Sequence, residues 1–197
     1  MMKQVLAFAV GVVFVTAAQA APETYVIDNA HTFPRFEYSI LGRLSRENKF
    51  DKTSGSITLD RESGNGRIEI KIEAGSVNTG NPVLNKIIRG REFFNTEKYP
   101  EISYISNDLQ FDGDKLIAVH GLLTIKDVTR RVALKITDFY CFSQEAPKIN
   151  ICGAIAKGTV KRSDFNMGKY APQVSDEMTL RIIVEAENRI EPESRPR

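Results

Sequence analysis

The residues best suited to hold a polar ligand lie in one short stretch, from Ile88 to Pro100. It places three aromatic side chains beside three basic ones: Phe93, Phe94 and Tyr99, with Arg89, Arg91 and Lys98. Arg89 carries a planar guanidinium whose paired N–H donors match anionic oxygens, and a salt bridge at a strand end is its alternative role. Pro100 disfavours a helical conformation at Tyr99 and ends the stretch. The segment is either a lid over a sheet or barrel, or a connector whose aromatics cap the core.

A second candidate is the polar pair Asp28 and His31, three residues apart near the start of the mature chain. The pair forms either a polar clasp at one end of a barrel or a structural hydrogen bond that ties down the first strand. Catalysis would require a distant Ser or Thr to join it. The sequence has two histidines and lacks HxxxH spacing, a GxSxG elbow and a Gly-rich phosphate loop. We therefore predict no enzymatic activity, cofactor or metal site.

These side chains must be positioned mainly by β-strands. Apolar and polar residues alternate with period two in Ile68–Ile72 and in Met178–Val184, which indicates strands with one buried face. The predicted strands are 25–38, 47–52, 56–60, 67–73, 102–111, 115–125, 131–137, 151–161 and 178–185. Short turns with Gly, Asn or Asp join them in chain order. We therefore predict an all-β, eight-stranded antiparallel up-and-down barrel, because closure removes the exposed edges of an open sheet.

One short helix is predicted at residues 81–88, with Asn81 as its N-cap and Pro82 in the first turn. Together with the aromatic segment it would close one mouth of the barrel. Five aromatic residues are expected to face the interior: Phe36, Phe93, Phe94, Tyr99 and Phe165. The sequence leaves open whether they line a ligand channel or fill a core.

The ends of the chain indicate export. Residues 1–20 have a positive start, a short apolar run and an Ala-x-Ala site, which is the pattern of a cleaved signal peptide. Residues 21–188 then form one domain, and residues 189–197 are a charged tail that we expect to be disordered. A formal net charge of +2 argues against nucleic acid as a partner. In a Gram-negative cell the mature protein would be periplasmic.

Cys141 and Cys152 both lie in the exported part of the chain. An oxidising compartment favours a disulfide between them, and ten intervening residues disfavour a CxxC-type redox pair. We predict a structural bridge between neighbouring strands, with a polar loop between the two cysteines.

Several motifs along the chain carry a family resemblance. They are Tyr25–Asp28 with His31, Phe50–Asp51, Gly55–Asp60, Ser76–Thr79, Ile88–Arg89 with Phe93–Phe94, Lys98–Ile102, Gly121–Ile125 with Val128–Thr129, and Lys161–Met167. In this order and spacing the chain resembles the YceI-like, or polyisoprenoid-binding, family of exported bacterial proteins. Family members often carry a His where this chain has Ile87 and another near Ile40, which implies a more apolar entrance, and a Gly in the turn where this chain has Asp127.

The resemblance implies a lipocalin-like barrel whose apolar lumen carries an isoprenoid lipid, such as a polyprenyl phosphate or a ubiquinone-like quinone. Transient contact with a membrane and a homodimer are also implied. The ligand-binding residues proposed on this basis are Asp28, His31, Phe36, Ile87, Arg89, Phe93, Phe94, Tyr99 and Phe165. The alternative function is an envelope interaction protein with a filled barrel and no lipid cargo.

Overall fold

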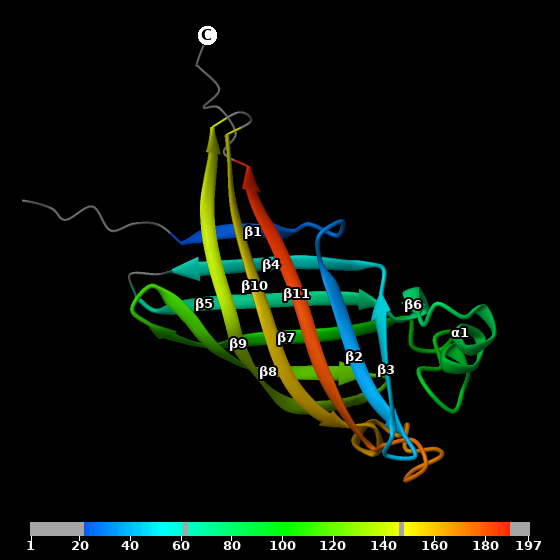
Figure 1. Cartoon of the computed structure of the whole chain (residues 1–197). Helices are drawn as coiled ribbons and strands as arrows, with labels where there is room; N and C mark the ends of the chain where they lie inside the picture. Colours follow the sequence, from blue (N-terminus) through cyan, green and yellow to red (C-terminus); the bar gives the residue numbers. More distant parts are fainter. Residues whose placement is uncertain (1–21, 61–62, 146–147, 190–197) are drawn as a thin grey trace, which may run out of the picture.

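The computed structural model describes residues 22–60, 63–145 and 148–189. In these ranges the chain forms eleven β-strands, one α-helix and two short 3₁₀ helices (Figure 1). The strands are β1 (Glu23–Ile27), β2 (Phe33–Ile40), β3 (Leu44–Phe50), β4 (Thr53–Asp60), β5 (Asn65–Glu73), β6 (Val77–Asn78), β7 (Glu101–Asp112), β8 (Lys115–Ile125), β9 (Val128–Glu145), β10 (Lys148–Lys161) and β11 (Glu177–Arg189). The helices are α1 (Pro82–Arg89), η1 (Ala74–Ser76) and η2 (Arg162–Phe165). The predicted signal peptide, residues 1–20, lies outside the described residues.

The eleven strands form the eight long strands of a closed barrel. β1 and β2 both pair with β11 on one side, and with β4 and β3 respectively on the other. β4 and β3 in turn pair with β5 and β6. The consecutive strands β1 and β2, β3 and β4, and β5 and β6 are therefore each one long barrel strand with an interruption. Neighbouring barrel strands follow chain order, and all of them pair antiparallel. The predicted eight-stranded up-and-down barrel is therefore confirmed.

The first predicted strand, 25–38, is wrong in one respect, because a turn divides it into β1 and β2. Asp28 starts this turn, and its carboxylate accepts the backbone N–H of Ala30 at 2.8 Å. The buried Thr32 hydroxyl ends the turn, where it bonds both the N–H and the carbonyl of Glu185 at 3.1 Å. Side-chain hydrogen bonds of Asp28 and Thr32 thus interrupt the ladder with β11 at the seam where the barrel closes.

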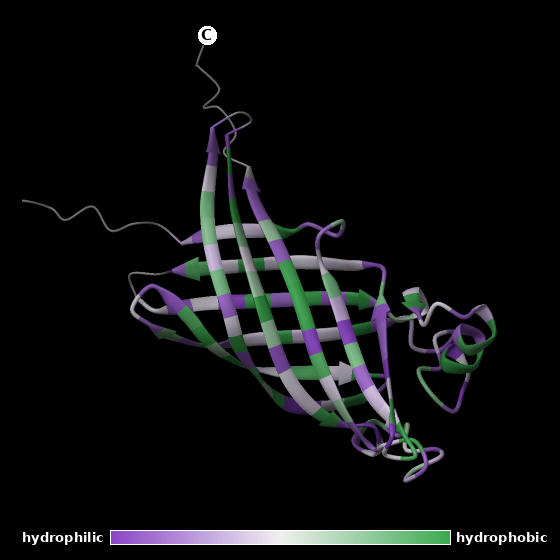
Figure 2. Ribbon diagram, viewed as in Figure 1, coloured by the Kyte–Doolittle hydropathy of each residue, from purple (hydrophilic) through white to green (hydrophobic). Residues whose placement is uncertain are grey.

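The alternating sequence pattern places apolar side chains inside the barrel and polar ones outside. Figure 2 shows this alternation as bands along each strand. In β11, for example, Met178 is buried and Leu180 packs against the core, whereas Thr179 is exposed. Burial on the inner face at about 25 cal/mol per Å² is the main stabilising contribution to such a barrel.

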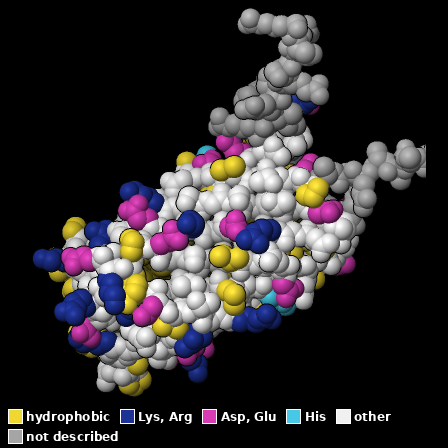
Figure 3. Space-filling model, turned by 180° about the vertical axis from the view of Figure 1, so that it is seen from behind, with side chains coloured by type: hydrophobic (Ala, Val, Ile, Leu, Met, Phe, Trp, Pro, Cys, Tyr) yellow, Lys and Arg dark blue, Asp and Glu magenta, His cyan; other side chains and the backbone are white. Residues whose placement is uncertain are grey.

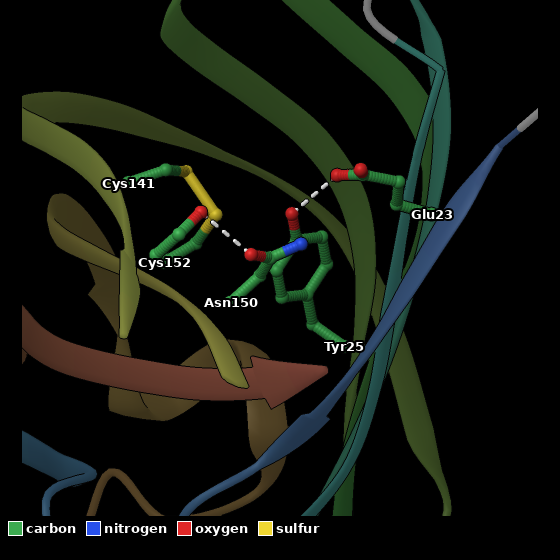
Figure 4. Close-up of a disulfide and its surroundings, with 6 residues drawn as sticks. Glu23, Tyr25, Cys141, Asn150 and Cys152 are labelled. Carbon is green, nitrogen blue, oxygen red and sulfur yellow. Dashed lines mark hydrogen bonds between the residues drawn. A yellow bond between two sulfur atoms is a disulfide. The ribbon is translucent and has the colours of Figure 1, made fainter. Parts of the chain in front are cut away.

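The β9–β10 hairpin is longer than the sequence indicated. The predicted disulfide between Cys141 and Cys152 is present, and the two residues are direct partners in the β9–β10 ladder (Figure 4). The predicted polar loop between them is wrong, because the ladder continues to the pair Glu145 and Lys148. Cross-strand pairing, including the bond from Ser143 Oγ to Asn150 Oδ1 at 2.7 Å, keeps these polar residues in strands.

β11 also continues further than expected. The predicted tail began at residue 189, but the backbone of Arg189 pairs with Ile149 in the ladder with β10. The long partner strand explains this extension. Residues 190–197, the rest of the predicted tail, lie outside the described residues.

The barrel has two distinct ends. The helix end carries α1 with residues 79–100, the turns at 41–43 and 126–127, and the connection 162–176. The terminal end carries residues 22 and 189, the last residues of β4, β7 and β9, and the first residues of β5, β8 and β10. At the helix end, the side chain of Asn81 accepts the N–H groups of Val83 and Leu84, so the predicted cap is confirmed. In the described part of the chain, no helix has the length and apolar character to cross a bilayer.

Candidate ligand-binding lumen

The inner faces of the barrel strands surround a cavity of about 170 Å³. Its wall is almost wholly apolar, and it extends from Tyr25 and Cys152 near the terminal end to Phe165 and Met167 at the helix end. One water molecule needs about 10–15 Å³ of such space, so the cavity is roughly ten times larger. Well-packed interiors rarely leave voids larger than one water. This lumen is therefore not filled by its own side chains.

Aromatic rings form the floor of the lumen at the helix end. Phe94 follows α1 and inserts its buried ring between Phe36 of β2 and Phe50 of β3. The ring centroids lie 6.1 Å from Phe36 and 5.5 Å from Phe50, in edge-to-face arrangements that stabilise aromatic pairs. Phe165 of η2 is 1% exposed and borders the same cavity. Phe94 thus closes the lumen at the helix end, which fits both a lid and a connector whose aromatics cap the core.

Arg162 is a buried cation beside the cavity, and four of the five N–H donors of its guanidinium are engaged by the main chain. Its guanidinium donates to the main-chain carbonyls of Met167 at 2.6 Å, Ser175 at 2.9 Å, Val174 at 3.0 Å and Lys169 at 3.2 Å. Burial lowers its pKa, because the charged form is poorly solvated there. These bonds fold the connection between β10 and β11 over the end of the barrel. The sequence analysis assigned Arg162 no role, although it belongs to the Lys161–Met167 motif.

Tyr104 places a phenol inside the wall. Its hydroxyl lies 3.0 Å from the carbonyl of Val132, to which it donates, and 3.3 Å from that of Val119. Burial raises the pKa of Tyr104 strongly, so the group stays neutral. The ring fits because Gly121 faces it: a Cβ there would lie 2.5 Å from Tyr104 Cζ. The glycine of the Gly121–Ile125 motif thus has a packing role.

Four of the proposed binding residues at the helix end do not reach the lumen. Arg89 is exposed, and its Nη2 donates to the carbonyl of Val77 at 3.3 Å. Ile87 is 50% exposed on the outer side of α1. Phe93 packs on Tyr170 with centroids 6.2 Å apart. Tyr99 donates to Asp127 Oδ2 at 3.2 Å. These residues hold the connections of the helix end together, and none borders the cavity.

Asp28 and His31 lie on the outer wall, at the seam between the β1–β2 turn and β11. His31 Nδ1 is 2.6 Å from Asp28 Oδ2 and 3.7 Å from Glu185 Oε1. The hydrogen bond lowers the pKa of Asp28 and raises the pKa of His31. The ligand atoms of all three residues lie within 4.8 Å of one another, so a cation could replace the shared proton. The position fits the structural interpretation of this pair rather than a clasp on a ligand in the lumen.

The lumen therefore gathers three of the nine proposed binding residues, Phe36, Phe94 and Phe165. Sequence reasoning did not single out the other large rings of the wall, Tyr25, Phe50, Tyr104 and Phe139. These residues occupy inward positions of alternating strands, and that alternation is the sequence signal that could have identified them. An eight-stranded barrel has an interior that is either filled by side chains or holds one small ligand, and an unfilled apolar space suits the second arrangement.

Comparisons with known proteins show the family of this chain. The YceI-like domain matches residues 25–186, and the chain belongs to the YceI-like family. It is 29% identical to the UPF0312 protein plu2095 of Photorhabdus laumondii over 186 residues, covering 93% of this chain and 96% of that one. It is 28% identical to protein YceI of Salmonella arizonae over 188 residues, covering 94% and 97%.

Two solved structures show the same fold. The crystal structure of Burkholderia cenocepacia BcnA superposes with a TM-score of 0.67 at 23% identity, covering 81% of this chain and 99% of that one. A polyisoprenoid binding domain from Saccharophagus degradans, implicated in plant cell wall breakdown, superposes with a TM-score of 0.63 at 19% identity, covering 83% and 97%.

Proposed function

We propose that this protein binds an isoprenoid lipid in its lumen and carries it through an aqueous compartment, without catalysis. The observation that carries the proposal is the continuous apolar cavity, too large to be a packing defect. The polyisoprenoid-binding domain that shares this fold supports the same ligand class. The open space disfavours the alternative of an interaction protein with a filled barrel.

The driving force for such binding is burial of the prenyl chain. Each buried CH₂ contributes about 0.8 kcal/mol, and the cost of association offsets part of the sum. Few directional contacts are needed, which agrees with a wall that is almost wholly apolar.

The charged side chains beside the lumen indicate which lipid head group the interior can accept. Arg162 already serves four main-chain carbonyls, and Arg35 Nη1 pairs with Glu47 Oε1 at 2.6 Å on the outer wall. A phosphate drawn into this interior would meet two guanidinium groups that main-chain carbonyls and Glu47 already engage, and a buried charge that is poorly paired is strongly unfavourable. A quinone-like neutral head group fits the lumen, whereas a polyprenyl phosphate would have to keep its phosphate at a mouth.

We further propose that the carrier works in the periplasm, as a homodimer. The disulfide between Cys141 and Cys152 supports an oxidising compartment, together with the signal peptide predicted from the sequence. Light scattering after size exclusion tests the dimer.

Native mass spectrometry of protein purified from its own compartment, followed by organic extraction, tests the function. We expect a bound mass that extracts as a quinone or another prenyl lipid. Protein of bare mass that also stays empty after incubation with prenyl lipids would contradict the proposal and favour the interaction protein.

A further inference from the structure

We propose that the helix end of the barrel is a docking surface for anionic lipid bilayers. The proposal rests on the lipid-carrying function above, because a carrier must meet the membrane that supplies or receives its cargo. The helix end lies opposite to the start of β1 and the end of β11 (Figure 1), and Phe94 borders the lumen at this end.

Large apolar side chains stand out from this end. Val83 and Ile87, four residues apart on one side of α1, are 70% and 50% exposed. Leu41 at the tip of the β2–β3 turn is 67% exposed, and Tyr170 is 56% exposed. These residues come from three separate connections and do not form a groove for a rigid partner.

Direct contacts join the three connections into one surface. The N–H of Leu41 donates to the carbonyl of Gln173 at 2.7 Å. Tyr170 packs on Phe93, and Lys169 Nζ lies 3.3 Å from Glu92 Oε2. The protruding apolar residues are therefore held together on the end of the barrel.

Basic residues surround the apolar ones. We call this set the basic rim: Arg43, Lys86, Arg89, Arg91, Lys98, Lys126 and Lys169. Five acidic residues lie in the same connections: Glu92, Glu97, Asp127, Asp164 and Asp176. Glu92 pairs with Lys169, so six basic and four acidic residues remain outside this ion pair. Figure 3 shows Lys and Arg gathered with hydrophobic side chains toward this end.

Among the residues whose side chains the structure describes, the terminal end carries more acidic than basic groups. Its described turns and strand ends carry mostly acidic residues: Glu23, Asp60, Asp112, Asp114, Glu145 and Glu187, against Lys115 and Lys148. The whole chain is nearly neutral, so its charge asymmetry, rather than its net charge, would orient the barrel. Near an anionic surface the helix end is attracted and the terminal end is repelled.

A bilayer fits this surface better than an acidic protein does. Separate apolar side chains on a convex end can each enter the fluid interface, and long basic side chains reach the lipid head groups around them. Docking in this orientation would bring the membrane next to the Phe93–Phe94 segment, which lies between the surface and the lumen.

Sedimentation with vesicles tests the proposal, using one preparation of pure phosphatidylcholine and one with a quarter of phosphatidylglycerol. The wild-type protein should bind the anionic vesicles at low salt and dissociate at about 0.5 M salt, where the Debye length falls to about 4 Å. Lys86→Gln with Arg91→Gln should weaken binding about twenty-fivefold, at roughly fivefold for each charge. Val83→Ser with Ile87→Ser should weaken it about tenfold.

Matched controls separate docking from general effects. Ile105→Ser with Leu122→Ser removes a neighbouring exposed apolar pair from the outer wall of β7 and β8, and Lys115→Gln with Lys148→Gln removes two charges from the terminal end. Both should bind like the wild type. Equal binding to the two vesicle types, or equal losses in the control variants, would overturn the proposal. Lipid loading from detergent needs no bilayer, so a docking failure with intact loading leaves the carrier function standing.

Discussion

Replacing Arg162 by Met should destabilise the whole barrel. The side chain is 5% exposed, and its guanidinium satisfies four main-chain carbonyls in the 162–176 connection. Met has a similar length but no donor, so the carbonyls would lose their partners. A buried acceptor left without its partner costs about 1–3 kcal/mol, and only part of the four would regain water. We therefore expect a loss of about 3–5 kcal/mol, a large share of the 5–15 kcal/mol typical of a domain.

Urea unfolding followed by circular dichroism measures this loss directly, and tyrosine fluorescence can follow the same transition because the chain lacks Trp. The midpoint should fall while the slope with urea stays constant, since the surface exposed on unfolding is unchanged. Arg162→Lys keeps the charge with fewer, differently arranged donors and should fall between the wild type and the Met variant. A loss below about 1 kcal/mol in Arg162→Met would refute the assignment of the four bonds as essential to the fold.

Three further predictions concern the wall of the barrel. The raised pKa of His31 stabilises the fold below about pH 6.5, and the lowered pKa of Asp28 stabilises it above about pH 4. The pair should therefore stabilise the fold most between these two pH values. Its contribution should decrease as pH rises through the folded pKa of His31 or falls through the folded pKa of Asp28. A pH–stability profile that is unchanged in His31→Gln would contradict this prediction. Replacing both Cys141 and Cys152 by Ser should cost about 3 kcal/mol or less, as measured by urea unfolding. Tyr104→Phe should cost about 1 kcal/mol in the same assay, and no change would mean that its hydroxyl bond contributes nothing.

The sequence determined the strand content and the closure of the barrel, because a period of two in apolar residues has few other physical solutions. It also located α1, where Asn81 and Pro82 form a local signal that needs no tertiary context. It missed the division of the first strand, because the turn at Asp28 is fixed by the contact of Thr32 with Glu185, more than 150 residues away in the chain.

The candidate site was harder to predict than the fold. The choice of Arg89 over Arg162 followed from the ordinary expectation that arginines meet anions or solvent. Only the three-dimensional structure shows that Arg162 turns inward to main-chain carbonyls while Arg89 stays on the surface. Among the aromatics, Phe93 and Phe94 are adjacent in sequence, yet one packs on Tyr170 and the other enters the lumen.

Blocking the lumen tests the central claim most directly. Ala156 is buried on the inner face of β10 and borders the cavity, whereas its neighbour Ile155 does not. Ala156→Phe would place a ring in the space that a prenyl chain needs, and Ile155→Phe is the matched control on the other face. Displacing only two methylene groups, at about 0.8 kcal/mol each, already weakens binding about tenfold.

The measurement is equilibrium binding of a long-chain ubiquinone to the wild type and to both variants, each checked for unchanged unfolding. If the lumen holds the lipid, the wild type and Ile155→Phe bind alike, and Ala156→Phe loses about tenfold or more in affinity. Equal affinity in all three folded proteins would place the lipid elsewhere and contradict the account.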